Sequence, residues 1–118
     1  MMNRKELGGV GEKEVCKFLE KKGYFVISKN FSCKFGEIDI IATDKNELVF
    51  IEVKTRCSKK YGEARDAVNT YKKKHIKKAA TFYISKNRLE NKFIRFDVIE
   101  VYLRKNGFFI NHIKNTLW

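Results

Sequence analysis

The sequence has little of what a membrane or secreted protein needs. Its uninterrupted apolar runs, such as residues 108–110, are far shorter than the roughly 18 residues of a membrane-spanning helix. Residues 1–7 are followed by glycine and glutamate instead of an apolar stretch with a small-residue cleavage site, so we expect no secretory signal. These absences exclude a membrane span and favour a cytoplasmic protein without a membrane partner.

Cysteine and histidine are also scarce. Cys16, Cys33 and Cys57 are odd in number and form no Cys-x-x-Cys pair, and His75 lies far from His112 in the chain. A structural zinc site needs four such ligands at characteristic spacings, so we expect none. We interpret the thiols as small buried side chains without chemistry.

Negative charge is scarce relative to positive charge. The chain has 26 lysines and arginines but 14 acids, which gives a net charge of +12 at pH 7. Clustered Lys and Arg bind phosphate backbones by releasing counterions, so the charge indicates a polyanionic partner. Ribosomal proteins, chromatin proteins, nucleases and proteins of membrane surfaces share this balance, so charge alone leaves the partner open.

Length and apolar content predict a single domain over residues 1–118, with enough hydrophobic side chains (43%) to bury a core. Asn3 and Glu6 have the spacing of a capping box, and apolar periodicity predicts helices at residues 3–22 and 66–87. Short stretches rich in Val, Ile and Phe predict strands at residues 24–31, 37–43, 48–54, 93–102 and 107–113.

This order of elements predicts an α/β fold. A long helix separates the third strand from the fourth, so these two strands are expected to be parallel neighbours joined by a right-handed crossover. The first three strands and the last two follow one another closely. We therefore predict a mixed β-sheet flanked by helices.

The second and third strands bring two acids together. If their hairpin closes symmetrically about residues 45–46, Asp39 lies opposite Glu52. Opposed Cβ atoms are roughly 4.5–5.5 Å apart, and like charges there destabilise a sheet unless something compensates. A divalent cation such as Mg²⁺ is one compensation, since it binds one or two carboxylates plus waters and phosphate oxygens. The alternative is a sheet-edge pair that Lys54 and Arg56 neutralise.

Register and alternation make two further predictions for these strands. The same symmetric hairpin puts Glu37 across from Lys54. Because side chains alternate faces along a strand, Ile38 is expected on the same face as Ile40 and Ala42.

One polar residue of each helix lies on the apolar stripe. Glu12 has helical spacing to Val15, which puts a carboxylate on the face that packs toward the protein. Its alternative is a first-turn acid that interacts with the helix dipole. Lys72 falls midway between Val68 and Ile76, whereas the other lysines of that helix have the pattern of a solvated face.

An ordered set of these residues resembles a known family. It comprises GE at residues 11–12, GEIDII at 36–41, FIEVKTR at 50–56 and RFDV at 95–98. This set resembles the YraN family of small bacterial endonuclease-like proteins, which belongs to the PD-(D/E)XK nuclease superfamily and is similar to archaeal Holliday-junction resolvases. The resemblance implies a restriction-endonuclease-like αβββαβ core with an extra C-terminal strand. An isoleucine stands where the motif's name has proline.

The resemblance also implies an activity: a Mg²⁺- or Mn²⁺-dependent endonuclease that hydrolyses phosphodiester bonds in branched or otherwise irregular DNA. It implies Asp39, Glu52 and Lys54 as catalytic residues and Glu37 as a supporting one. Its implied metal ligands are Glu12, Asp39, Glu52 and the carbonyl of Val53. Its implied nucleic-acid-binding residues are Arg56, Lys72, Lys73, Lys74, Lys77 and Lys78.

Other functions remain as alternatives: a non-catalytic protein that binds DNA or RNA through the nuclease fold, or a plain basic adaptor. The intact Asp39, Glu52 and Lys54 favour the enzyme, because a binding protein would gain affinity by losing two acids beside phosphate. DNA is favoured over RNA as the partner. The likeness to junction resolvases and the apolar residues 108–110 and 117–118 predict a homodimer. The alternative is that these aromatics complete a small core.

Overall fold

The computed structural model describes residues 3–56 and 70–116 of the chain. Five strands form one sheet in the order β1-β2-β3-β4-β5. The elements are α1 (Arg4–Lys21), β1 (Phe25–Cys33), β2 (Gly36–Asp44), β3 (Glu47–Arg56), α2 (Thr70–Lys86), β4 (Phe93–Arg104) and β5 (Gly107–Ile113). Neither of these helices is long and apolar enough to cross a membrane. The predicted order of elements is confirmed, and the part of the second helix expected before residue 70 lies outside the described residues.

The sheet is mixed, as predicted. β3 and β4 run parallel, in register from Glu47 opposite Phe93 to Arg56 opposite Tyr102. All other neighbouring strands are antiparallel. β3 and β4 are the neighbouring strands that a helix separates in the sequence. Parallel neighbours need such a long crossover, because the chain must return to the end of the sheet at which the first strand began.

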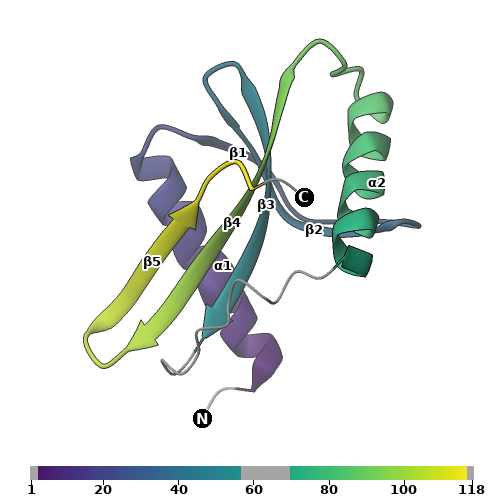
Figure 1. Ribbon diagram of the computed structural model, residues 1–118. Coiled ribbons are helices and arrows are strands. Elements are labelled where there is room, and N and C mark those ends of the chain that lie inside the picture. Colours follow the sequence, from purple (N-terminus) through teal and green to yellow (C-terminus); the bar gives the residue numbers. More distant parts are fainter. Residues whose placement is uncertain (1–2, 57–69, 117–118) are drawn as a thin grey trace.

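The two helices cover opposite faces of the sheet (Figure 1). Val15 and Leu19 of α1 are fully buried in a cluster with buried apolar side chains of β2, β3 and β4. Ile76 and Tyr83 of α2 pack on the other face, where Phe50 is fully buried. The two apolar stripes that predicted the helices are therefore the surfaces that form the core.

Local signals set the bounds of α1. The Asn3 side chain accepts a hydrogen bond from the Glu6 N–H at 2.8 Å, and the Asn3 N–H donates to the Glu6 carboxylate at 3.0 Å. This confirms the predicted capping box. At the other end, Gly23 has φ +92, a conformation that glycine adopts without strain, and the chain turns into β1.

β2 leaves β3 before it leaves β1. Its pairing with β3 runs from Asp44 opposite Glu47 to Ile40 opposite Ile51, which is the register that the symmetric hairpin predicts. Beyond Ile40, β2 pairs with β1 alone and curves towards α2 (Figure 1). The separation of β2 from β3 opens the sheet at this point.

Two predictions are wrong because of this separation. Glu37 is exposed and lies opposite Ser32 of β1, whereas it was expected opposite Lys54. Ile38 is buried in the cluster under α2, although alternation from Ile40 predicts the face that α1 covers. Alternation and register hold only while a strand follows its neighbour, and β2 no longer follows β3 here.

Candidate active site

A cleft of about 690 Å³ opens where β2 separates from β3. It is lined by Leu7, Gly8, Glu12, Asp39, Glu52, Val53, Lys54, Thr55, Arg56 and Lys72. These residues come from α1, β2, β3 and α2, so all four elements meet at the cleft. Every residue that the sequence predicts as catalytic or metal-binding lines it.

Asp39 lies one step beyond the end of the ladder between β2 and β3, so the predicted strand pairing of Asp39 with Glu52 is not formed, although both line the cleft. Its carboxylate accepts a hydrogen bond from the Val53 N–H at 2.8 Å. In a continued antiparallel ladder, alternation would direct the N–H and the carbonyl of Val53 to Ile38. The carboxylate therefore replaces a backbone acceptor, and the Val53 carbonyl points towards a strand that has already diverged.

The environment of Asp39 in the cleft opposes the ionisation of its carboxyl group. Burial raises the pKa of Asp39 to about 7, and the negative charges of Glu52 and Glu12 contribute to the rise. The hydrogen bond from the Val53 N–H acts in the other direction. Asp39 is therefore a carboxyl group that titrates near neutral pH instead of in the acid range.

Glu52 is buried, with 4% of its surface exposed, and two lysines compensate its charge. The Lys54 ammonium lies 3.3 Å from Glu52 Oε2, and the Lys72 ammonium, carried by α2, forms an ion pair with the same oxygen. A buried carboxylate needs such partners because its desolvation costs several kcal/mol. One acid of β3 thus links the sheet to α2.

The two lysines differ in how firmly each holds its proton. Burial lowers the pKa of Lys54, and the neighbouring Lys72 adds to the fall, while Glu52 opposes it. Burial also acts to lower the pKa of Lys72, but the ion pair with Glu52 outweighs it and the net change is upward. Lys54 is therefore the better proton acceptor, and Lys72 is the more permanent positive charge.

Glu12 reaches the cleft from α1 because that helix packs very close to β3. A Cβ atom built at the buried Gly11 would clash with the Thr55 hydroxyl oxygen, so any side chain there would force Thr55 to move. Burial raises the pKa of Glu12, and the charge of Glu52 raises it too, while a hydrogen bond with the Asn30 side chain lowers it. The interpretation of Glu12 as an inward-facing acid is consistent with this environment.

The basic residues divide into two groups. Arg56 and Lys72 line the cleft, and Arg56 Nε is buried without a hydrogen-bond partner among the described residues. The remaining predicted nucleic-acid-binding residues lie along α2 outside the cleft: Lys73, which is half-buried, and Lys74, Lys77 and Lys78, which are exposed. The structure thus brings two of the six basic residues to the acids.

The donor set of the cleft fits a hard divalent cation, although the side chains are not arranged around one. Among residues 3–56 and 70–116, no three His, Cys, Asp or Glu side chains are close enough to hold a metal ion. Lys54 and Lys72 compensate Glu52 instead. Mg²⁺ and Mn²⁺ need only one or two carboxylates beside waters and phosphate oxygens, and Asp39 with Glu52 and the Val53 carbonyl supplies these oxygen donors. Burial and the nearby charge of Glu52 raise the pKa of Asp39, and a bound cation would favour its ionised form against both.

Comparison with known proteins identifies the family. The model of uncharacterised protein family UPF0102 matches residues 11–101, from α1 to β4. The chain belongs to the UPF0102 family. A UPF0102 protein of Caldicellulosiruptor saccharolyticus is 46% identical over 98% of this chain and 99% of its own length. One of Clostridioides difficile is 48% identical over the same shares. These relatives match nearly the whole chain, and the family match includes every residue of the cleft except Leu7 and Gly8.

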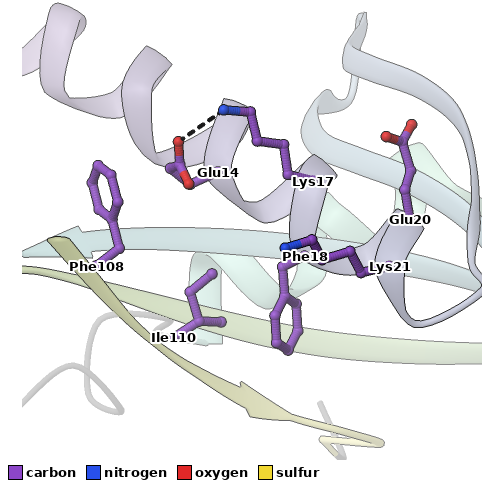
Figure 2. A pocket seen from close by; sticks show the side chains of 7 residues that line it. All are labelled: Glu14, Lys17, Phe18, Glu20, Lys21, Phe108 and Ile110. Atoms are coloured by element: carbon purple, nitrogen blue, oxygen red, sulfur yellow. Dashed lines mark hydrogen bonds and ion pairs between the residues drawn. The ribbon is translucent and has the colours of Figure 1, made fainter.

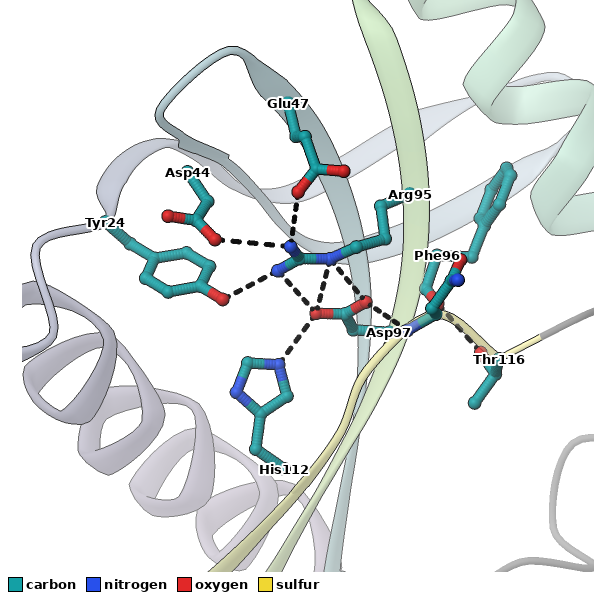
Figure 3. A network of polar contacts seen from close by, with 9 residues as sticks. Tyr24, Asp44, Glu47, Arg95, Phe96, Asp97, His112 and Thr116 are labelled. Atoms are coloured by element: carbon teal, nitrogen blue, oxygen red, sulfur yellow. Dashed lines mark hydrogen bonds and ion pairs between the residues drawn. The ribbon is translucent and has the colours of Figure 1, made fainter.

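This UPF0102 chain has a second polar cluster, which sequence reasoning missed (Figure 3). The Arg95 guanidinium donates to both oxygens of Asp97 at 3.0–3.3 Å and to the Tyr24 hydroxyl at 2.6 Å. His112 Nε2 lies 2.7 Å from the Asp97 carboxylate. Because an ionised carboxylate only accepts, His112 carries its proton on Nε2. Arg95 and Asp97 belong to the RFDV motif at residues 95–98 that contributed to the family resemblance. Their partners Tyr24 and His112 come from distant parts of the sequence.

A second cavity, of about 620 Å³, lies between α1 and β5 (Figure 2). Phe18, Phe108 and Ile110 form its apolar wall, and Glu14 and Lys17 of α1 form an ion pair of 3.4 Å at its edge. An ion pair at a water-exposed edge contributes little to stability and indicates no chemistry. The homodimer predicted partly from residues 117–118 stays a prediction, because these lie outside the described residues.

Proposed function

We propose that the protein is a Mg²⁺- or Mn²⁺-dependent endonuclease that hydrolyses phosphodiester bonds in branched or otherwise irregular DNA. The observation that carries the proposal is the gathering of two acids, Asp39 and Glu52, with the Lys54 amine in one cleft of a strongly basic chain. A protein that only bound phosphate would not need two acids beside Lys54, Lys72 and Arg56. The sheet is mixed, has a helix on each face, and has parallel strands β3 and β4 that α2 connects along the chain. This arrangement supports the kinship with restriction-endonuclease-like proteins.

Asp39, Glu52 and the Val53 carbonyl would hold the cation, with Glu12 completing its oxygen ligands. When bound, the cation supplies a Lewis acid for a phosphate oxygen and lowers the pKa of a bound water. Loading requires Lys72 to give up part of its ion pair with Glu52. Its ammonium group would then be available to a phosphate oxygen of the substrate.

The chain's own residues would handle the proton and the charge of the reaction. In hydrolysis the water oxygen bonds to phosphorus while the bond to the leaving oxygen breaks, which yields a phosphate monoester and an alcohol. Lys54 would accept a proton from the attacking water, because burial makes its neutral form accessible. Lys72 and Arg56 would stabilise the negative charge that develops on the phosphate.

The lysines of α2 would hold the DNA at a distance from the reaction. Lys74, Lys77 and Lys78 are exposed on the helix that carries Lys72 to the cleft. Contacts of lysine with phosphate fix the position of a duplex without reading its sequence. We therefore expect binding that depends on salt and on DNA shape more than on sequence.

The decisive experiment is cleavage of junction, flap, single-stranded and duplex DNA, and of an RNA duplex, with Mg²⁺, with Mn²⁺ and with EDTA. We expect metal-dependent cleavage of a branched DNA. Glu52→Gln should lose cleavage by about 100-fold or more, as expected when charged active-site groups are removed. The same variant should keep or gain DNA affinity, because it removes a negative charge beside phosphate.

Glu14→Gln is the matched control, since it makes the same chemical change on α1 at a half-buried position outside the cleft. It should leave cleavage unchanged. If binding and cleavage fall together in Glu52→Gln, the variant has a folding defect, and Asp39→Asn, which retains an acceptor for the Val53 N–H, takes its place. Equal cleavage by Glu52→Gln and the control would refute the proposed site.

A specific observation favours a second candidate, a nucleic-acid-binding protein without catalysis. Lys54 and Lys72 already compensate Glu52, so the charge of this acid is balanced without a cation. On this view the acids stabilise the junction between β3 and α2. A wild-type protein that binds the panel tightly and cleaves none of it with either metal would select this candidate.

A further inference from the structure

A smaller cavity of about 370 Å³ reaches the same acids from the side of α2. It is lined by Gly36, Glu37, Asp39, Glu52, Tyr71, Lys72, His75 and Ile76. Asp39, Glu52 and Lys72 therefore belong to both cavities. Tyr71 and His75 belong to this one alone, and the proposed reaction assigns them no role.

Tyr71 and His75 form a tilted aromatic pair at this opening. Their ring centroids are 4.2 Å apart, and the planes are tilted by 42°. The His75 Nδ1 atom lies 3.0 Å from the Tyr71 carbonyl oxygen, which can only accept, so this nitrogen carries the proton. This hydrogen bond and the helical backbone fix the imidazole behind the phenol ring.

Gly36, the first residue of β2, lies beside the pair. A Cβ atom added there, where φ is +146, would lie 3.4 Å from the Cβ of His75, which is ordinary van der Waals contact. The start of β2 and His75 therefore line the same cavity. By contrast, Tyr71 is 71% exposed and presents a flat aromatic surface directly beside Lys72.

We propose that Tyr71, supported by His75, is a stacking platform for an unpaired nucleobase next to the phosphate that occupies the cleft. This inference rests on the proposed function and narrows its substrate class. Bases stack on exposed aromatic side chains whatever their identity, because each has a π-face. The neighbouring Lys72, Lys73 and Lys74 supply the positive charge that such a strand's backbone needs.

Base pairing decides which DNA can use the platform. Inside a duplex both faces of a base are covered by its neighbours, so a base reaches Tyr71 only from a single strand, a flap or the open centre of a junction. The platform would therefore favour irregular DNA through stacking, while the exposed lysines of α2 bind any DNA through its phosphates.

Binding in EDTA tests the platform apart from catalysis. The ligands are a short single-stranded DNA, the same backbone with every base replaced by an abasic site, and a duplex. We expect the wild type to prefer the base-containing strand over the abasic strand by about tenfold. Tyr71→Ala should lose this preference and Tyr71→Phe should keep it, while neither should change duplex affinity.

Phe93→Ala is the control, because Phe93 is an equally exposed aromatic (67%) at the start of β4 and lies outside both cavities at the acids. It should behave as the wild type. The platform is refuted if Tyr71→Ala keeps the preference, or if it weakens duplex binding as much as single-strand binding. A wild type that shows the Tyr71-dependent preference but cleaves nothing would retain the platform and remove the nuclease; cleavage without the preference would do the reverse.

Discussion

Replacing Asp97 with asparagine tests whether the cluster around Arg95 holds the fold together. Asp97 is fully buried, and its oxygens accept hydrogen bonds from Arg95, from His112 and, at 2.9 Å, from the Asn115 N–H. Asparagine has the same shape and can still accept from the Asn115 N–H. It removes the charge that compensates Arg95 and leaves an amide facing two donors.

The size of the effect follows from what remains around Arg95. Breaking one partner out of a buried ion pair costs about 3–5 kcal/mol, because the other charge stays buried. Arg95 keeps Glu47 at 2.6 Å and Asp44 at 3.2 Å, both more exposed than Asp97, so part of its charge stays compensated. We therefore expect Asp97→Asn to lower the free energy of unfolding by about 3 kcal/mol, at the low end of that range.

The assay is urea unfolding at pH 7 and pH 3, followed by circular dichroism, with Asp44→Asn as the control. Asp44 contacts the same guanidinium but is 22% exposed, so its loss should cost about 1 kcal/mol or less. Burial alone would raise the pKa of Asp97, but His112, Arg95 and the Asn115 N–H outweigh it and lower the pKa below 3.8. The stabilisation by ionised Asp97 is therefore present above this ordinary value and is lost as pH falls, so the free energies of unfolding of Asp97→Asn and the wild type should converge in acid.

The reasoning would be refuted if Asp97→Asn cost no more than Asp44→Asn at pH 7. The buried charges would then behave as a surface ion pair. Folded Asp97→Asn should also bind DNA as the wild type does. Arg95 is the strand partner of Val49, which lies on the face of the sheet that α1 covers, whereas Lys72 reaches Glu52 from α2.

Three further predictions concern the cleft and the two helices. Because the pKa of Asp39 is raised, its contribution to the free energy of unfolding is fully present below the ordinary pKa of 3.8 and is lost as pH rises through about 7. Without metal, Asp39→Asn should match the wild type in urea unfolding near pH 4 and be more stable by about 1–3 kcal/mol at pH 8, which is less than the roughly 4 kcal/mol that the whole shift would give. A variant that is less stable than the wild type at pH 8 would contradict this. Gly11→Ala should cost about 1–3 kcal/mol by overpacking against Thr55, whereas Gly9→Ala, with no atom within 4 Å of the added Cβ, should gain about 0.5–1 kcal/mol in thermal unfolding; equal effects would disprove the close contact. Duplex affinity should fall steeply with salt, and Lys74→Ala should lower the slope of log K against log[salt] by about 0.9 without changing cleavage, so an unchanged slope would remove Lys74 from the interface.

The fold was predictable because its determinants are local. Alternation and apolar periodicity predicted all the strands and both helices, and the bounds of β5, residues 107–113, are those observed. The hairpin register held for five consecutive pairs because a two-residue turn leaves little freedom in pairing. The parallel pairing of β3 and β4 followed from the length of the connection alone.

What failed depends on three-dimensional packing. The departure of β2 from β3 has no local signal, so Glu37 and Ile38 were assigned by a register that had already ended. The network of Arg95 and Asp97 was not predictable either, because its partners lie up to 71 residues away in sequence. Sequence patterns show which side chains share a face, but not which faces meet.

The same departure explains why the acids could be predicted although their surroundings could not. While β2 and β3 stay paired, both backbone groups of Val53 would be satisfied by β2, and opposed acids at Asp39 and Glu52 would only destabilise the sheet. Once β2 turns away, Asp39 satisfies the Val53 N–H at 2.8 Å, and the β2 backbone no longer pairs with the carbonyl of the same residue, which lines the cleft. An unfavourable pair of charges thus becomes a pair of oxygen donors in one cleft, which is the chemistry that the proposed cation requires.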